Sequence, residues 1–184
     1  MNDSSRPSWD ETWINVARVV ARRSLCERDK IGAVIVDPRM RIVATGYNGP
    51  PSGFTLPDRL TADRPCAEWC PRSATADWIA GKPPYENGED FPKWANAGFH
   101  GPHPDYSDCP SLHAEANALS VCERFVRENG TIYVTGDICF GCAKLIANSG
   151  LARVVIDGVR PAIHRNPARS REFLVTCGLA VVVV

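Results

Sequence analysis

The chain has 184 residues, of which 44% are hydrophobic and 23% charged, as in an ordinary soluble domain. Its formal net charge is zero, so no overall positive charge attracts nucleic acid. The longest strongly apolar run, 179–184, is too short to cross a bilayer, and the polar stretch 1–8 has no signal-peptide core. We therefore expect a cytoplasmic protein with neither a nucleic-acid nor a membrane partner.

Helical and strand periodicities alternate along the chain. Apolar residues recur at helical spacing over 9–25, after the N-cap candidate Ser8. Two β-branched strands are expected at 31–36 and 41–47, joined by a turn at 37–40. Strands that alternate with helices predict α/β/α layers around one sheet. The later expected helices are 113–128, 140–148 and 167–177, and the later expected strands are 131–135, 153–156 and 179–184.

The stretch from 54 to 109 differs in composition from the rest of the chain. Most of the 15 prolines lie between Pro50 and Pro110, and prolines at that density prevent long helices and continuous sheet. Three tryptophans fall in the same stretch, Trp69, Trp78 and Trp94. We interpret it as a Pro/Trp-rich insertion within one domain that covers 1–184.

Two short motifs carry the chemistry, His113-Ala114-Glu115 and Cys139-Phe140-Gly141-Cys142. Each stands at the start of an expected helix, where the helix dipole favours thiolates, so one imidazole and two sulfurs can converge on zinc. Three protein ligands with an open fourth position are typical of catalytic zinc. A wholly structural zinc would need a fourth protein ligand, which the sequence does not clearly offer there.

Glu115 is the expected catalytic residue because it is not needed as a ligand. Two thiolates cancel the charge of zinc, so the metal alone should acidify a bound water less than a site with neutral ligands does. A carboxylate that accepts the water proton compensates, and it can pass that proton to a ring nitrogen and a leaving amine. H-x-E followed by P-C-x-x-C is the described signature of zinc deaminases.

Ile138 stands where that signature has proline. Proline would fix the backbone before Cys139. Isoleucine frees that torsion and adds bulk near the expected pocket. The metal ligands are intact, so we expect activity, while the substrate preference remains open.

Beyond these motifs, the chain resembles the deoxycytidylate (dCMP) deaminase family of the cytidine deaminase-like superfamily. The loop TGYNGPPSG at 45–53 narrows the resemblance to dCMP deaminases. It implies a three-layer α/β/α fold with a mixed sheet of about five strands, and zinc-dependent hydrolysis of dCMP to dUMP and ammonia. The other matching stretches are IGAVIV at 31–36, HAEANAL at 113–119 and CFGCAKLI at 139–146.

The resemblance also assigns roles to single residues. It implies that His113, Cys139 and Cys142 bind zinc and that Glu115 shuttles protons. Asparagine can hydrogen-bond a sugar or base, and the family contacts its substrate at the position of Asn48. A tight turn is the simpler interpretation of that loop.

The resemblance also implies features of the loop at 45–53 and of the oligomeric state. Ala114 is expected at the substrate, and Tyr47, Gly49 and Gly53 lie in a loop associated with a regulatory nucleotide, dCTP or dTTP. Members regulated in this way are usually hexamers, so a homo-oligomer is expected. Arg28, which precedes a strand, is a candidate for binding the substrate phosphate, although a solvated surface charge is the simpler interpretation.

The other cysteines fall into two groups. Three lie near the insertion, where some bacterial and phage dCMP deaminases bind a structural zinc, and a tetrahedral site would need one histidine more. The alternative is that these thiols bind no metal. The tentative second site consists of Cys66, Cys70 and Cys109 with His103 or His100. Three cysteines in apolar helical surroundings are expected to be buried thiols, namely Cys26, Cys122 and Cys177.

Three alternatives to dCMP deamination stay open. The first is the same chemistry on another or a base-modified cytosine nucleotide or nucleoside. The second is a nucleic-acid-editing deaminase, which the neutral charge disfavours. The third is an inactive zinc-bound regulatory module, which the carboxylate of Glu115 disfavours because pure binding does not need it.

Overall fold

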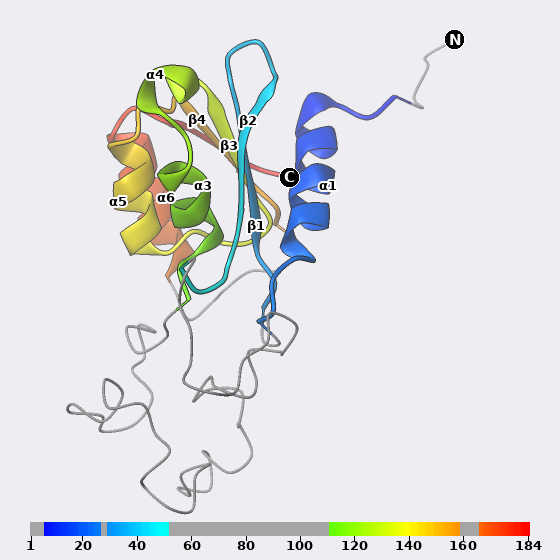
Figure 1. The fold of residues 1–184 in the computed structure, drawn as a ribbon. Coiled ribbons are helices and arrows are strands. Elements are labelled where there is room, and N and C mark those ends of the chain that lie inside the picture. Colours follow the sequence, from blue (N-terminus) through cyan, green and yellow to red (C-terminus); the bar gives the residue numbers. More distant parts are fainter. Residues whose placement is uncertain (1–5, 27–28, 52–110, 159–165) are drawn as a thin grey trace, which may run out of the picture. The chain divides into compact units, whose positions relative to one another are not determined.

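The structure, a computed structural model, describes residues 6–26, 29–51, 111–158 and 166–184 (Figure 1). The chain divides into two compact units, and the fold described below is that of the first, formed by 1–24, 30–49 and 112–184. The second unit comprises 25–29 and 50–111. The expected insertion at 54–109 lies wholly outside the described residues, so the assignment of 1–184 to one domain stays a prediction.

A mixed five-stranded sheet forms the centre of the first unit. The strand order is β2-β1-β3-β4-β5. Strand β1 is antiparallel to β2 and β3, whereas β3, β4 and β5 run parallel to one another. The strands are β1 (Gly32–Val36), β2 (Ile42–Tyr47), β3 (Thr131–Val134), β4 (Arg153–Ile156) and β5 (Ala180–Val183).

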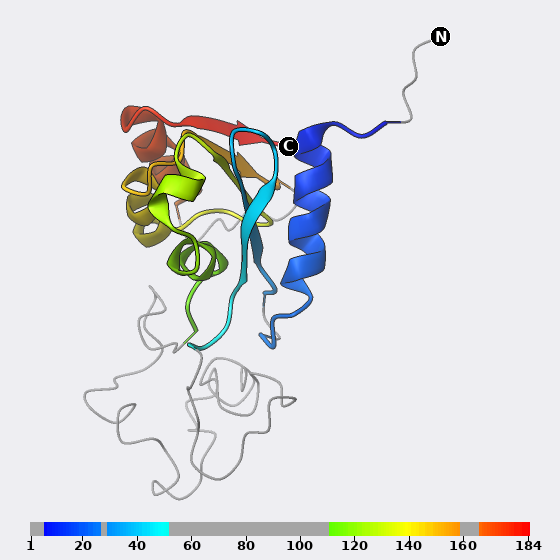
Figure 2. The same cartoon turned by 45° about the horizontal axis from the view of Figure 1, so that its top comes forward.

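Helices cover both faces of this sheet (Figures 1 and 2). Helix α1 (Trp9–Ala21) lies on one face, and α3 (Ala114–Ser120), α5 (Phe140–Ala147) and α6 (Pro167–Thr176) lie on the other. Alternate residues of β1 enter two cores: Val34 packs on the α1 side, and Ile35 packs on the opposite side. The predicted three-layer α/β/α architecture is confirmed.

Helix α1 begins where the sequence predicts and ends earlier. Ser8 is its N-cap and forms a capping box with Glu11. The helix ends at Ala21 rather than at 25. Past that end, the Ser24 hydroxyl donates to the Asn48 carbonyl at 2.7 Å, so the chain is tied to the loop after β2 instead of continuing as helix.

The expected helix 113–128 is wrong as a single element. It is two helices, α3 and the short α4 (Arg124–Arg127), with a break between them. Arg127 donates to the carbonyls of Leu119, at 2.9 Å, and Cys122. A side-chain donor five to eight residues further along the chain thus satisfies the carbonyl of Leu119 in α3 and that of Cys122 in the break, which a continuous helix would have satisfied internally.

The cysteines expected to be buried thiols differ in exposure. Cys122 is buried, Cys26 is partly buried and Cys177 is exposed. The prediction is wrong for Cys177 because α6 ends at Thr176 and leaves this residue at the C-cap. None of the described helices is long and apolar enough to span a membrane.

Candidate zinc centre and active site

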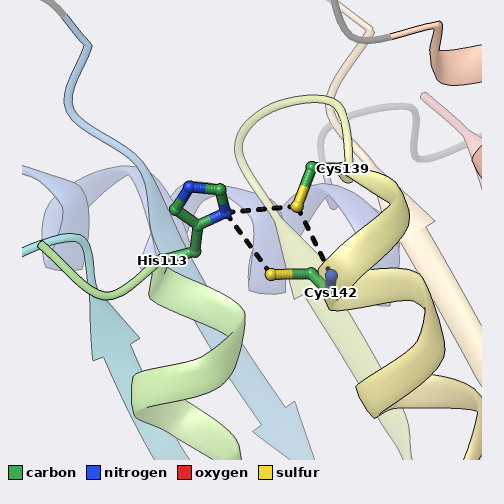
Figure 3. Close-up of side chains that lie close together, drawn as sticks. All are labelled: His113, Cys139 and Cys142. Atoms are coloured by element: carbon green, nitrogen blue, oxygen red, sulfur yellow. Dashed lines mark hydrogen bonds between the residues drawn. The ribbon is translucent and has the colours of Figure 1, made fainter. Parts of the chain in front are cut away.

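The metal-ligand candidates lie at the first residues of two helices. His113 is the N-cap of α3, Cys139 is the N-cap of α5, and Cys142 lies in the first turn of α5. In Figure 3 the imidazole extends from the start of α3 toward both sulfurs at the start of α5. The Cys142 backbone N–H donates to the Cys139 sulfur at 3.4 Å, which fixes the turn between the two thiols.

The three donor atoms have the spacing of a zinc site. His113 Nδ1 lies 3.3 Å from Cys139 Sγ and 3.4 Å from Cys142 Sγ, and all the ligand atoms lie within 4.8 Å of one another. Tetrahedral geometry with Zn–N and Zn–S bonds of about 2.0 and 2.3 Å places nitrogen and sulfur roughly 3.5 Å apart. The donor set therefore fits one zinc ion held by three ligands.

The pKa values of the two thiols shift in opposite directions. The hydrogen bond from the Cys142 thiol, assisted by His113, holds the pKa of Cys139 well below its ordinary value, although burial opposes this. The same hydrogen bond and burial raise the pKa of Cys142. Metal binding requires both sulfurs as thiolates, so zinc would displace the proton of the Cys142 thiol.

Glu115 lies beside these ligands. It is in the first turn of α3 and only 3% exposed. Its carboxylate interacts with the Cys142 thiol and contributes to raising the pKa of that thiol. An ionised carboxylate is costly to bury without a charged or hydrogen-bonding partner. A cation held by the three ligands would supply such a partner.

The loop after β2 is fastened to the start of α3. Gly49 and Leu112 exchange two backbone hydrogen bonds, of 3.1 and 2.9 Å. The Asn117 side chain of α3 donates to the Tyr47 carbonyl at 2.8 Å. These contacts hold residues 47–49 next to the residue that precedes His113, although the two segments are far apart in the sequence.

Asn48 is oriented within this loop by Ile31. The Asn48 Oδ1 accepts from the Ile31 N–H at 2.8 Å, and the Asn48 N–H donates to the Ile31 carbonyl at 3.1 Å. A simple tight turn would not need the side-chain bond. The amide therefore has a fixed orientation near the start of α3, as a substrate contact requires.

The approach of β2 to α3 depends on Gly46. A Cβ at this position would lie 2.3 Å from the Ala114 carbonyl oxygen and 2.4 Å from the Ala118 nitrogen. The Ala114 side chain is fully buried. The expected contact of Ala114 with the substrate therefore stays a prediction.

Ile138 is buried beside the zinc-ligand candidates, and its effect on the pocket stays a prediction. It is 1% exposed and belongs to the hydrophobic core that also contains Cys142 and Ala143. Leu112 and Asn117 are the site residues that sequence reasoning missed. Asn117 lies within the HAEANAL stretch, but no spacing rule predicts the partner of its amide.

Several site candidates lie outside the described residues, so their roles stay predictions. They are Arg28, Gly53, Cys66, Cys70, His100, His103 and Cys109.

An α/β/α sheet protein with a His/Cys/Cys centre and a buried glutamate at the start of adjacent helices has the architecture of a zinc-dependent deaminase. Residues 7–157 match the family described as the cytidine and deoxycytidylate deaminase zinc-binding region. The chain belongs to this family.

Individual relatives agree with that assignment. The chain is 38% identical over 151 residues to the deoxycytidylate deaminase of Mycobacterium phage D29, covering 82% of this chain and 95% of the relative. It is 32% identical over 152 residues to the deoxycytidylate deaminase of Schizosaccharomyces pombe, of which it spans 37%.

The fold also resembles solved structures. The dCMP deaminase of cyanophage S-TIM5, determined in complex with dCMP and dUMP, superposes with a TM-score of 0.61 at 22% identity. The match covers 97% of this chain and 98% of that one. This likeness concerns the fold, and it confirms the α/β class.

Proposed function

We propose that this protein hydrolyses dCMP to dUMP and ammonia. Membership of the family makes the chain a hydrolytic deaminase. The deoxycytidylate deaminase of phage D29, matched over 95% of its length, supports the substrate. The observation that carries the proposal is the convergence of His113, Cys139 and Cys142 beside the buried carboxylate of Glu115.

His113, Cys139 and Cys142 would hold the zinc ion through Nδ1 and two thiolates. Zinc, when bound, supplies Lewis-acid activation of the attacking water. The two helix N-termini support this arrangement because their dipoles favour the thiolate forms of the cysteines. With three protein ligands, one position stays open for water.

Glu115 would move the protons of the reaction. Its carboxylate accepts a proton from the attacking water and donates it to N3 of the cytosine ring, which makes C4 more electrophilic. Glu115 would then take the proton of the new C4 hydroxyl and deliver it to the exocyclic amine, so that the C4–N bond breaks, ammonia leaves and a carbonyl forms at C4. The burial of Glu115 beside Cys142 supports this role, because it holds the carboxylate next to the metal-ligand candidates.

Asn48 and Ala114 would orient the nucleotide. The hydrogen bond from Ile31 fixes the Asn48 amide, so its position is already determined before the sugar binds. Ala114 would contribute a backbone group from the first turn of α3, where N–H groups lack partners within the helix. Arg28 is retained as the candidate for the 5′-phosphate.

Ammonia release from a substrate panel tests the proposal. The zinc-loaded protein would be assayed with dCMP, CMP, deoxycytidine, dCTP and 5-substituted dCMP. We expect turnover of dCMP. If dCMP released no ammonia but another nucleotide did, the proposed substrate would be wrong and the proposed chemistry would stand. If no compound released ammonia, both would be wrong.

The same panel separates the alternatives. A base-modified cytosine nucleotide as substrate would show as turnover of 5-substituted dCMP in preference to dCMP. An inactive regulatory module would bind zinc and nucleotide without releasing ammonia. A nucleic-acid-editing deaminase would instead act on single-stranded RNA or DNA.

We further propose that dCTP and dTTP regulate the protein and that it forms a hexamer. If Tyr47, Gly49 and Gly53 form a regulatory loop, dCTP should raise and dTTP should lower the rate with dCMP. If the protein is a hexamer, light scattering should give six times the 20.1 kDa chain mass. A rate unchanged by dCTP and dTTP would contradict the regulation. The mass of a monomer would contradict the hexamer.

The second zinc is tested by metal content. If Cys66, Cys70, Cys109 and His103 or His100 hold a structural zinc, the protein should contain two zinc ions per chain, and Cys109→Ser should leave one. Unchanged zinc content in this variant would contradict the second site. Cytoplasmic localisation stays a prediction.

A further inference from the structure

Helix α6 contacts the chain just before the first zinc-ligand candidate. Arg171 forms an ion pair with Asp137, two residues before Cys139. The Asp137 side chain is 2% exposed, whereas that of Arg171 is 33% exposed. Breaking an ion pair to a buried carboxylate is costly, so this pair favours one position of the segment relative to α6.

The same helix also contacts the residue that follows Cys139. The Arg169 guanidinium lies over the Phe140 ring, 4.2 Å from its centroid. Phe173 meets the same ring edge-on at 5.1 Å between centroids. Cation–π and edge-to-face contacts both have preferred geometry, so they restrict where Phe140 can lie.

Helix α6 is itself held firmly. Leu174 is fully buried in the core on this side of the sheet, and Ser170 is 1% exposed. The residues that contact the chain around Cys139 therefore belong to a helix that is packed into the core.

These contacts restrain the chain around Cys139, next to the position where the deaminase signature has proline and this chain has Ile138. Proline there would restrain the backbone before the ligand by fixing φ, and Ile138 does not. We propose that Arg171 is a positioning residue that, through Asp137, holds Cys139 where zinc binds. This inference rests on the zinc ligation proposed above and concerns a residue outside the ligand set and Glu115.

The chain offers a matched control. Arg18 of α1 pairs with Asp157 at 2.8 Å, and its carboxylate partner is also buried, with side chains 49% and 6% exposed. Asp157 directly follows β4, and Asp137 follows the end of β3 by three residues. Arg18 belongs to the helix on the other face of the sheet, away from α5 and α6.

The test compares zinc release from Arg171→Met, Arg171→Lys and Arg18→Met with release from the unsubstituted protein. Zinc loss to a chromophoric chelator is followed at a temperature where circular dichroism shows each protein folded. Cobalt-substituted samples report ligand geometry through their d–d and sulfur-to-cobalt absorption bands. Both readouts are independent of catalytic activity.

We expect Arg171→Met to release zinc about tenfold faster, as when support of a metal ligand is lost, and to alter the cobalt bands. Arg171→Lys should lie closer to the unsubstituted protein because it keeps the charge. Arg18→Met should lose thermal stability without changing either readout.

Unchanged zinc release in Arg171→Met would overturn the inference. Equally accelerated zinc release from Arg18→Met would also overturn it, because faster zinc release would then reflect only the loss of stability. If the unsubstituted protein binds no zinc or cobalt through His113, Cys139 and Cys142, both the ligation and this inference are wrong. Failure to deaminate dCMP with normal metal binding would contradict only the substrate.

Discussion

The proposed chemistry depends on a carboxylate that lies beside the metal ligands without being one of them. Glu115 follows His113 by two residues, so the first turn of α3 places both at the same helix end. Burial keeps the carboxylate from bulk water, where it would transfer protons to solvent rather than to substrate. We therefore propose that Glu115 moves protons and does not bind the metal.

Replacing Glu115 by glutamine tests this role. Glutamine keeps the size of the side chain but cannot accept and return a proton. We expect kcat to fall by about 10²–10⁴-fold, the usual contribution of a positioned general acid–base group. Zinc content measured by atomic absorption should stay unchanged. Full activity in Glu115→Gln would refute the mechanism, and lost zinc would indicate a ligand role instead.

At this scale the sequence predicted the residues that share a short motif. His113, Glu115, Cys139 and Cys142 were identifiable because their spacing matches a described chemical pattern. The ion pair between Arg171 and Asp137 was not identifiable. Its partners lie 34 positions apart, and only the packing of α6 brings them together.

At the scale of elements, the site exists because strand β2 and helix α3 approach closely. Gly46 permits that approach on one side of the sheet. Gly32 permits a similar approach of β1 to α1 on the other side, where a Cβ would lie 2.1 Å from the Ala17 carbonyl oxygen. Only the first contact supports the candidate site.

The two glycines therefore form a matched pair for mutation. Gly46→Ala and Gly32→Ala should each lower the free energy of unfolding by about 1–3 kcal/mol, as overpacking does. Only Gly46→Ala should also raise KM for dCMP, because it displaces the start of α3 from the loop that carries Asn48. Denaturant unfolding and steady-state kinetics measure the two effects. Equal KM values in both variants would contradict the proposed dependence on this contact.

Element types were more predictable than their ends. Apolar periodicity identified β4 at 153–156 with the bounds that the structure has. The single helix expected over 113–128 was wrong because apolar periodicity does not report side-chain bonds to the backbone, such as those from Arg127 to the Leu119 and Cys122 carbonyls, which stabilise the break. Hydrogen bonds of this kind can interrupt a continuous helical pattern.

At the scale of the whole molecule, one polar cluster joins α1 to the sheet. Arg153 of β4 donates to both oxygens of Asp10 at 2.7 and 2.6 Å. The Tyr133 hydroxyl of β3 also donates to Asp10, at 3.1 Å. Burial, together with the bond to Asp10, raises the pKa of Tyr133 to about 12, so the phenol remains a donor at neutral pH.

This cluster predicts an acid-sensitive part of the stability. The hydrogen bond from Arg153 lowers the pKa of Asp10 in the folded state below 3.8, the ordinary value. Its stabilising contribution is therefore complete above the unfolded pKa and is lost as the pH falls through the folded pKa. Unfolding free energies of Asp10→Asn and the unsubstituted protein should differ most near neutral pH and converge in acid. A difference independent of pH would contradict this.

The three layers were predictable from alternating strands and helices, since this pattern admits few architectures. The strand order was not predicted. Neither was the Asp10–Arg153 pair, whose partners are separated by 143 positions. The proline-rich composition predicted a change of character near residue 54, and the boundary between the two units falls close by, at 49–50.

The most direct measurement is the rate of dUMP formation from dCMP as zinc is removed and restored. The protein would be stripped with a chelator, checked for folding by circular dichroism, and titrated with zinc. We predict no turnover in the folded, metal-free protein and recovery as zinc occupies the site formed by His113, Cys139 and Cys142. Undiminished dUMP formation without zinc, or no dUMP formation by the zinc-loaded protein, would contradict the assignment as a zinc-dependent dCMP deaminase.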